Sequence, residues 1–205
     1  MTYAFIRHGQ TDWNRDDKLQ GSSDIPLNEA GRGQAHEAAR VLAESSASGS
    51  GPWTAVVSSP LSRARETARI IAADLGVELG PSYPDLIERD YGALEGTSSS
   101  AAVAQHPHRD YPGAETLDDV ARRGRRAVDA IDADYGDAEV VIVAHGTLIR
   151  YTLASLAGHP IEGIRNGTIS TIERDDHGGW VVLTVNGNPC EAADDEGRHW
   201  PGMAG

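Results

Sequence analysis

Two apolar segments, far apart in the sequence, both end in a His-Gly pair. The first is YAFIRHG at residues 3–9, and the second is EVVIVAHG at residues 139–146. A third apolar run, TAVVSSP at residues 54–60, has the same β-type composition. Runs of this length and character are typical of strands that are buried on both faces of a sheet. They constrain the fold more than any other feature, because both faces of that sheet must be covered.

Helical patterns alternate with these strands. Apolar residues recur at helical spacing in four segments, which are residues 27–45, 61–76, 115–135 and 147–158. Asn28 is a candidate N-cap of the first helix, and Gly76 is expected to end the second. Residues 170–185 are typical of an antiparallel hairpin that turns at Gly178. The repeated strand-helix units predict an α/β fold, a three-layer α/β/α sandwich with a mainly parallel central sheet.

Length and composition set the bounds on this fold. At 205 residues with 39% apolar content, the chain is long enough for one sizeable core and short for two. We expect one domain over residues 1–187 and a loosely held acidic tail over residues 188–205. The single cysteine, Cys190, excludes an internal disulfide and fits a reducing compartment. Because no targeting or membrane-spanning run is visible, we expect a cytoplasmic protein.

The charge balance limits the partners. The formal net charge of −13 disfavours nucleic acid and anionic membranes, since both require a basic face on the protein. An anionic ligand must therefore be small and must be neutralised locally by a few basic side chains.

Basic side chains follow the predicted strands at one edge of the sheet. The carboxyl ends of parallel strands meet at the same edge, where open α/β sheets bind their ligands. His8 and His145 reach one crevice there if their strands are neighbours. Arg7 ends the first strand, and Arg63 lies one turn into the helix after the third. Gly146 lacks a Cβ, which would let an oxyanion approach the main chain. The sequence therefore predicts an anion site.

Six stretches, in order along the chain, resemble the histidine phosphatase superfamily, also called the phosphoglycerate mutase-like superfamily. They are RHGQTDWN, LQGSSDIPLNEAGRGQA, SSPLSRARETA, LIERDYGALEG, PGAETLDDVARR and VAHGTLIR. The resemblance covers nearly the whole chain, from residue 3 to about residue 187. The resemblance implies a phosphoglycerate mutase-like fold and a histidine phosphatase domain. The catalytic residues that it implies are Arg7, His8, Arg63, Glu88 and His145. Further positions that match contacts to the phosphoryl group or the substrate are Asn14, Gln20, Gly21 and Gly146.

The expected chemistry is phosphoryl transfer. Its loose transition state spreads charge over three equatorial oxygens, so catalysis depends mainly on positioned cations. Arg7, Arg63 and a protonated His145 are expected to supply them, and the planar arginine fork suits bidentate phosphate contact. His8 is expected to attack through a neutral ring nitrogen, with its other nitrogen held by a backbone acceptor, to give a phosphohistidine.

The departing oxygen also needs a proton. Glu88 is the best candidate acid, and the carboxylate left behind could activate water for the second half of the reaction. Asp90 and Glu95 lie close in the sequence and compete for this assignment. No metal ligand set or cofactor motif is visible, and His106 and His108 on a polar loop are expected to be solvated.

Three functions fit the resemblance. The stretch ERDYG at residues 88–92 resembles that of phosphoglycerate mutases, and a cofactor-dependent mutase-type transfer is one alternative. Residues 95–113, however, contain no lysine and only one arginine, Arg109, where mutases carry a long basic insertion that excludes water. A phosphomonoesterase is therefore favoured. A non-catalytic phospholigand-binding protein is the remaining alternative, although both the nucleophile and the acid are present.

The expected partner is a small phosphorylated substrate whose identity the sequence does not reveal. Specificity is expected to depend on residues 96–112, in particular on Arg109 and Tyr111, and on Arg89 beside the acid. The sequence does not determine the oligomeric state, although a homodimer would be unsurprising for a chain that resembles this superfamily.

Overall fold

The computed structural model describes residues 1–47 and 51–190. The strands are β1 (Thr2–Arg7), β2 (Trp53–Ser58), β3 (Glu78–Ser82), β4 (Glu139–Ala144), β5 (Ile169–Arg174), β6 (Trp180–Val185) and β7 (Asn188–Pro189). The α-helices are α1 (Asp12–Arg15), α2 (Glu29–Ala47), α3 (Ser62–Leu75), α4 (Ser99–Gln105), α5 (Leu117–Tyr135) and α6 (Gly146–Ala157). Two short 3-10 helices, η1 (Pro84–Leu86) and η2 (Gly92–Leu94), lie between β3 and α4.

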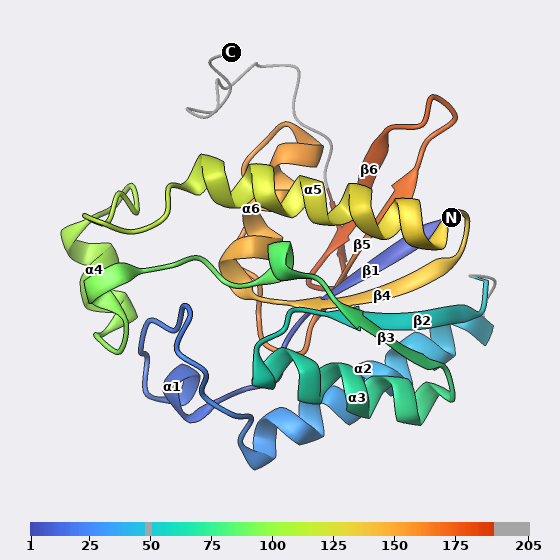
Figure 1. Cartoon of the computed structure of the whole chain (residues 1–205), viewed down its shortest axis with the longest axis horizontal. Helices are drawn as coiled ribbons and strands as arrows, with labels where there is room; N and C mark the ends of the chain where they lie inside the picture. The colour runs from blue at the N-terminus through green and yellow to red at the C-terminus, as the bar shows by residue number, and fades with distance from the viewer. Residues whose placement is uncertain (48–50, 191–205) are drawn as a thin grey trace.

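The strands form a seven-stranded sheet in the order β3-β2-β4-β1-β5-β6-β7. The neighbours from β3 to β1 run parallel, whereas β5, β6 and β7 pair antiparallel. Helices α5 and α6 cover one face of the sheet, and α2 and α3 cover the other (Figure 1). The predicted three-layer sandwich with a mainly parallel central sheet is confirmed.

Strand β1 shows how the sequence fills both layers. Its side chains alternate between the faces, as the two-residue period of a strand requires. Tyr3 and Phe5 pack in the cluster beneath α5 and α6, while Ala4 and Ile6 pack in the cluster beneath α2 and α3. All four side chains are buried. The sheet therefore has a hydrophobic core on each side, as the continuous apolar character of its strands predicted.

The predicted ends of elements are also found. The side chain of Asn28 accepts a hydrogen bond from the backbone N–H of Gly31 at 2.9 Å at the start of α2. Gly76 ends α3 in the left-handed conformation, with φ +67°. The hairpin turns between β5 and β6, where Gly178 has φ +80°.

β3 and α4 are two of the elements that the sequence patterns did not predict. β3 contains Gly80 and Pro81, which both disfavour strands, but it lies at the edge of the sheet, where a missing N–H is tolerated. The short helix α4 is capped by the side chain of Ser98. At the other end of the chain, β7 pairs with β6 as far as Pro189, and residues 191–205 of the expected tail lie outside the described residues.

The strand order brings the two His-Gly ends together. β1 and β4 are direct parallel neighbours, with Arg7 opposite Ala144, and the N–H of His8 donates to the carbonyl of Ala144 at 2.9 Å. β2 lies on the other side of β4. The segments that follow these strands meet at one end of the sheet, near α1 and α4 (Figure 1). The predicted crevice at the carboxyl edge is therefore present.

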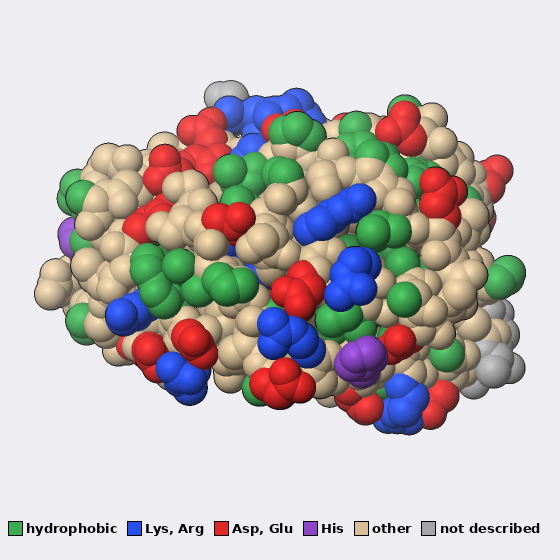
Figure 2. All heavy atoms as spheres, turned by 60° about the horizontal axis from the view of Figure 1, so that its bottom comes forward, with side chains coloured by type: hydrophobic (Ala, Val, Ile, Leu, Met, Phe, Trp, Pro, Cys, Tyr) green, Lys and Arg blue, Asp and Glu red, His purple; other side chains and the backbone are tan. Residues whose placement is uncertain are grey.

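Charge is mixed on the face that Figure 2 shows, where basic and acidic side chains are interspersed. On α2, Arg32 pairs with Glu66 at 2.9 Å and Arg40 pairs with Glu37 at 2.6 Å, so carboxylates neutralise these cations. No helix in the described part of the chain combines the length and the apolar character needed to span a bilayer.

Candidate active site

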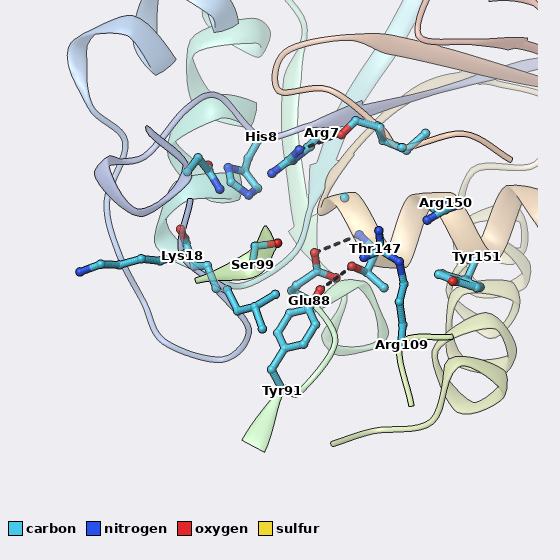
Figure 3. Close-up of a pocket in the computed structure, with 16 residues that line it drawn as sticks. Arg7, His8, Lys18, Glu88, Tyr91, Ser99, Arg109, Thr147, Arg150 and Tyr151 are labelled. Atoms are coloured by element: carbon cyan, nitrogen blue, oxygen red, sulfur yellow. Dashed lines mark hydrogen bonds between the residues drawn. The ribbon is translucent and has the colours of Figure 1, made fainter. Parts of the chain in front are cut away.

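A cavity of about 180 Å³ opens at the carboxyl edge of the sheet (Figure 3). Strand β1, helix α6 and the loops that contain residues 88 and 109 contribute to its wall. Of the residues predicted from the sequence, those that line it are Arg7, His8, Asn14, Gln20, Glu88, Arg109 and Gly146. Arg63, His145 and Gly21 do not line the cavity but are buried.

The ring of His8 is held in one tautomer. Its Nδ1 lies 2.7 Å from the carbonyl oxygen of Gly9, which can only accept, so Nδ1 carries the proton and Nε2 keeps its lone pair. Burial lowers the pKa of His8 well below its ordinary value, and the positive charges of Arg63 and Arg7 lower it further. His8 is therefore a neutral imidazole at pH 7, as a nucleophile must be.

Arg7 is anchored beside His8 from the same strand. Its Nη1 donates to the carbonyl of Ile164 at 2.7 Å, while its buried Nε has no hydrogen-bond partner among the described residues. A Cβ on Gly146 would lie 3.2 Å from that Nε. The missing side chain of Gly146 thus makes room for the guanidinium of Arg7, which differs from the expected role of admitting an oxyanion to the main chain.

Arg63 is fully buried, and the loop after α1 occupies its donors. Its Nη2 donates to the carbonyl of Gly21 at 2.8 Å, and its Nη1 donates to that of Ser23 at 2.9 Å. The amide oxygen of Gln20, oriented toward Arg63, accepts from Nε at 2.8 Å, while its nitrogen donates to Thr11 Oγ1 at 2.6 Å. Gly21 and Gln20 therefore hold Arg63. Burial lowers the pKa of Arg63 to about 10, so the side chain still carries a positive charge at pH 7.

His145 lies next to His8, with 5.1 Å between the ring centroids. Its Nε2 is 2.8 Å from the hydroxyl of Ser59, a residue that the sequence did not single out. Its buried Nδ1 has no partner among the described residues. Burial lowers the pKa of His145 well below the ordinary value, and the charge of Arg63 adds to this effect. Burial thus disfavours the protonated form of His145 in this structure, and its expected protonation beside a phosphoryl group stays a prediction.

Glu88 lies across the cavity at the beginning of α6. Its Oε1 accepts from the N–H groups of Arg89 at 2.8 Å and Leu148 at 3.1 Å, and its Oε2 accepts from that of Thr147 at 3.0 Å (Figure 3). The first turn of a helix favours a negative charge in this position. Backbone groups thus fix the carboxylate at the cavity wall.

The two competing carboxylates have other partners. Glu95 accepts hydrogen bonds from the backbone and side chains of Ser22 and Ser23, and these bonds lower its pKa although partial burial opposes the change. Asp90 is exposed and accepts from the N–H of Gly92 at 2.7 Å. Neither lines the cavity, so the geometry favours Glu88 among the three.

Two residues that sequence reasoning missed hold the loop after β1. Asn166 donates to the carbonyl of His8 at 2.8 Å and to the side chain of Asn14 at 3.2 Å. Thr67 accepts from the N–H of Gly9 at 3.1 Å. Neither residue has a sequence signal, because Asn166 lies in an ordinary turn and Thr67 inside a helix far along the chain. Both hold the backbone around His8 without lining the cavity.

The predicted specificity residues are divided between two places. Arg109 lines the cavity beside Thr147 (Figure 3) and has a left-handed backbone, with φ +59°, which is unfavourable for arginine. Arg89 and Tyr111 stack on each other, 4.9 Å from guanidinium to ring, and line a separate cavity. Polar lining residues that the sequence did not single out are Lys18, Tyr91, Ser99, Thr147, Arg150 and Tyr151.

These groups can bind and attack a phosphoryl anion. The neutral Nε2 of His8 lies on the same wall as the guanidinium of Arg7. The carboxylate of Glu88, on the loop after η1, faces them beside the start of α6 (Figure 3). Among the described residues, no group of three or more His, Cys, Asp or Glu side chains is placed to hold a metal ion.

The two buried histidines should make stability depend on pH. Below about pH 6.5 the unfolded chain binds protons on both histidines, whereas folded His8 and His145 stay neutral because burial lowers their pKa values. Acid therefore favours the unfolded state, and we expect the free energy of unfolding to fall by up to about 1.4 kcal/mol per pH unit for each histidine. Urea unfolding at pH 7.5, 6.5 and 5.5 measures this slope. The double variant His8→Asn, His145→Asn should be flatter, and an unchanged slope would contradict the assignment.

Comparison with known proteins identifies a matching family and several similar proteins. Residues 3–188 match the family model described as the histidine phosphatase superfamily (branch 1). The chain is 36% identical over 174 residues to a Bacillus subtilis protein named uncharacterized phosphatase PhoE, covering 83% of this chain and 86% of the relative. It is 33% identical over 191 residues to phosphoglycerate mutase-like protein 4 of Arabidopsis thaliana, covering 86% and 81%.

Solved structures that are similar to this chain also include phosphatases. One of them is a mycobacterial glucosyl-3-phosphoglycerate phosphatase in complex with VO3, which superimposes with a TM-score of 0.76 at 30% identity. The superposition covers 90% of this chain and 98% of that one.

Proposed function

Because this chain belongs to branch 1 of the histidine phosphatase superfamily, we propose that it is a metal-independent phosphomonoesterase that acts on a small phosphorylated metabolite through a phosphohistidine. The observation that carries the proposal is the tautomer of His8. The carbonyl of Gly9 holds its Nδ1–H, and the free Nε2 belongs to a neutral ring at the wall of the cavity. Relatives named as phosphatases support the same reaction.

In the first half-reaction the lone pair of His8 Nε2 forms a bond to phosphorus. The ester P–O bond breaks, its electron pair stays on the departing oxygen, and Glu88 gives that oxygen a proton. Arg7 contacts the equatorial oxygens, and buried Arg63 adds its positive charge from beneath them. A phosphoryl dianion beside His145 would favour the protonated imidazole, so substrate binding can restore the charge that burial removes.

In the second half-reaction water forms a new P–O bond while the P–N bond to His8 breaks. The Glu88 carboxylate takes the proton of the water, which returns the acid for the next turnover and releases inorganic phosphate. The hydrogen bonds from Thr147 and Leu148 keep the carboxylate on the cavity wall through both steps.

A mutase-type transfer is the second candidate, and relatives that carry mutase names favour it. A mutase must protect its phosphoenzyme from water. Within residues 95–113 Arg109 is the one basic residue apart from histidines, and no described carboxylate pairs with it. It is available for a second acidic group of a substrate, but a single cation does not make the closed basic lid that a mutase needs. Hydrolysis therefore remains the first proposal.

The phosphohistidine can be trapped directly. We expect a brief reaction with a ³²P-labelled phosphomonoester, quenched in alkaline denaturant, to leave label on His8 in the presence of EDTA. The chain with His8→Asn should take up none. Label that survives in this variant, or that requires added metal in the wild-type protein, would contradict the proposal. A phospholigand-binding protein would bind the ester without any covalent label.

A further inference from the structure

A second cavity, of about 350 Å³, lies between the loop after α4 and the start of α5. Arg89 and Tyr111 are its buried residues, with exposures of 2% and 4%. Residues of the loop and of the first turn of α5, including Leu117 and Asp118, complete its wall. Of the described residues only Arg109 lines both this cavity and the catalytic one.

Arg89 carries a buried positive charge without a counter-charge. Its Nε donates to the backbone carbonyl of Glu115 at 2.7 Å, but its buried Nη1 has no partner among the described residues. The nearby carboxylate of Glu115 pairs instead with Arg123, at 2.8 Å. Tyr111 contributes only its ring face, 4.9 Å from the guanidinium. Burying a charge without an anionic partner is costly, so this guanidinium needs an acceptor.

Tyr111, which lines the same cavity, carries a second buried donor. The hydroxyl of Tyr111 has no hydrogen-bond partner among the described residues. Buried hydroxyl and guanidinium groups without partners are uncommon in native proteins and point to an unseen acceptor. Arg89 Nη1 and the Tyr111 hydroxyl are thus two unpartnered donors on side chains that stack on each other.

The beginning of α5 adds a third element. Thr116 is the N-cap of this 19-residue helix and accepts from the N–H of Asp119. Leu117 and Asp118 form the first turn and line the cavity. The N–H groups of a first turn, together with the helix dipole, attract anions. Arg89 reaches this helix end from an independent part of the chain.

Two carboxylates border the cavity and oppose an anion, but both are exposed. The side chain of Asp110 is 77% exposed and lies 3.8 Å from the ring of His106. Asp118 is also exposed. Water and salt screen exposed charges strongly, whereas the buried charge of Arg89 is screened much less. The electrostatic potential inside the cavity is therefore dominated by Arg89 and favours an anion.

We propose that this second cavity binds a small oxyanion, a carboxylate or phosphate group, through Arg89, the Tyr111 hydroxyl and the first turn of α5. The site is separate from the catalytic cavity and does not depend on the proposed function. The shared chemistry is a compact anion with several acceptor oxygens, which can satisfy the guanidinium, the hydroxyl and the helix N–H groups together.

Residue-resolved NMR tests the site, because its amides are distinct from those of the catalytic cavity. We expect titration of ¹⁵N-labelled protein with inorganic phosphate, and separately with malonate, to shift the amides of Leu117 and Asp118 and the Nε–H of Arg89 with saturation. The anion that binds more tightly shows whether the site prefers a phosphate or a carboxylate group. Phosphate that binds in the catalytic cavity is followed separately at Thr147.

Two variants provide the controls. Tyr111→Phe keeps the ring and removes one donor, so the affinity at Leu117 and Asp118 should weaken by roughly 3- to 10-fold. Arg89→Gln should abolish saturable binding at Leu117 and Asp118. If Arg89→Gln does not fold, the affinity of Tyr111→Phe tests the proposal. The proposal is wrong if neither anion shifts these amides in the wild-type protein, or if Tyr111→Phe binds with unchanged affinity.

Discussion

Replacing His8 with asparagine is expected to lower kcat by at least about 10⁴-fold on every phosphomonoester. Removal of a covalent nucleophile leaves only the binding and electrostatic parts of catalysis, so the loss is large and does not depend on the substrate. Asparagine is smaller than histidine and can still donate to the carbonyl of Gly9, which accepts from His8 at 2.7 Å. Steady-state kinetics on an alkyl phosphate and an aryl phosphate measure the effect.

The control for this variant is His36→Asn. The side chain of His36 is 59% exposed and pairs with Asp74 on the surface of the protein, so its loss should leave kcat unchanged. Because His8 is only 3% exposed, the near-UV circular dichroism of His8→Asn must match that of the wild-type protein before the kinetics are interpreted. A folded His8→Asn protein that keeps more than about a tenth of the wild-type kcat would remove His8 from the nucleophilic role.

The meeting of the two histidines could be predicted from the sequence. Both follow apolar runs that are buried on both sides, and parallel strands of that kind end at one edge of the sheet. The order β2-β4-β1 then places His8 beside His145 and brings Arg63 in from the helix after β2. Apolar periodicity and the βα alternation were sufficient for this part, because both are local properties of the chain.

The electrostatics inside the site could not be predicted in the same way. The resemblance suggested that Arg63 and His145 contact a phosphoryl group, but the sequence did not reveal that both are fully buried. Burial, together with the charge of Arg63, disfavours the protonated form of His145 in the structure, whereas the sequence suggested a cation. Gln20 and Gly21 likewise hold Arg63, although the resemblance suggested phosphate contacts. Such roles depend on the three-dimensional packing around each side chain, which motif spacing does not describe.

Contacts between residues that lie far apart in the sequence could not be predicted either. The side chain of Asn166 donates a hydrogen bond to the carbonyl of His8, which is 158 positions earlier in the sequence. No local sequence pattern predicts such a contact. Arg89 was expected to influence specificity because it follows the acid in the sequence. Its side chain does not line the catalytic cavity; the guanidinium lies 4.9 Å from the ring of Tyr111 and 5.5 Å from that of Tyr91. Adjacent residues in a loop can face opposite sides, so neighbourhood in sequence is a weak guide to shared function there.

Glu88→Gln is expected to slow phosphorylation of the enzyme in a way that depends on the leaving group. Alkyl phosphates leave as strongly basic alkoxides that need a proton, whereas p-nitrophenyl phosphate leaves as a stable phenolate. The rate of phosphoenzyme formation should fall by roughly 10²- to 10⁴-fold with the alkyl ester and far less with the nitrophenyl ester. Single-turnover measurements are required, because Glu88 is also proposed to activate water in the second step.

The comparison between the two esters separates chemistry from structure. An amide in place of the Glu88 carboxylate loses part of the set of three backbone hydrogen bonds, so the variant should also be less stable. A loss of stability or of cavity shape slows both esters alike, whereas loss of the acid slows the alkyl ester selectively. Asp90→Asn, at an exposed carboxylate, and Glu95→Gln, at the carboxylate that holds Ser22 and Ser23, are the matched controls. If either control shows the selective loss and Glu88→Gln does not, the acid is a different carboxylate.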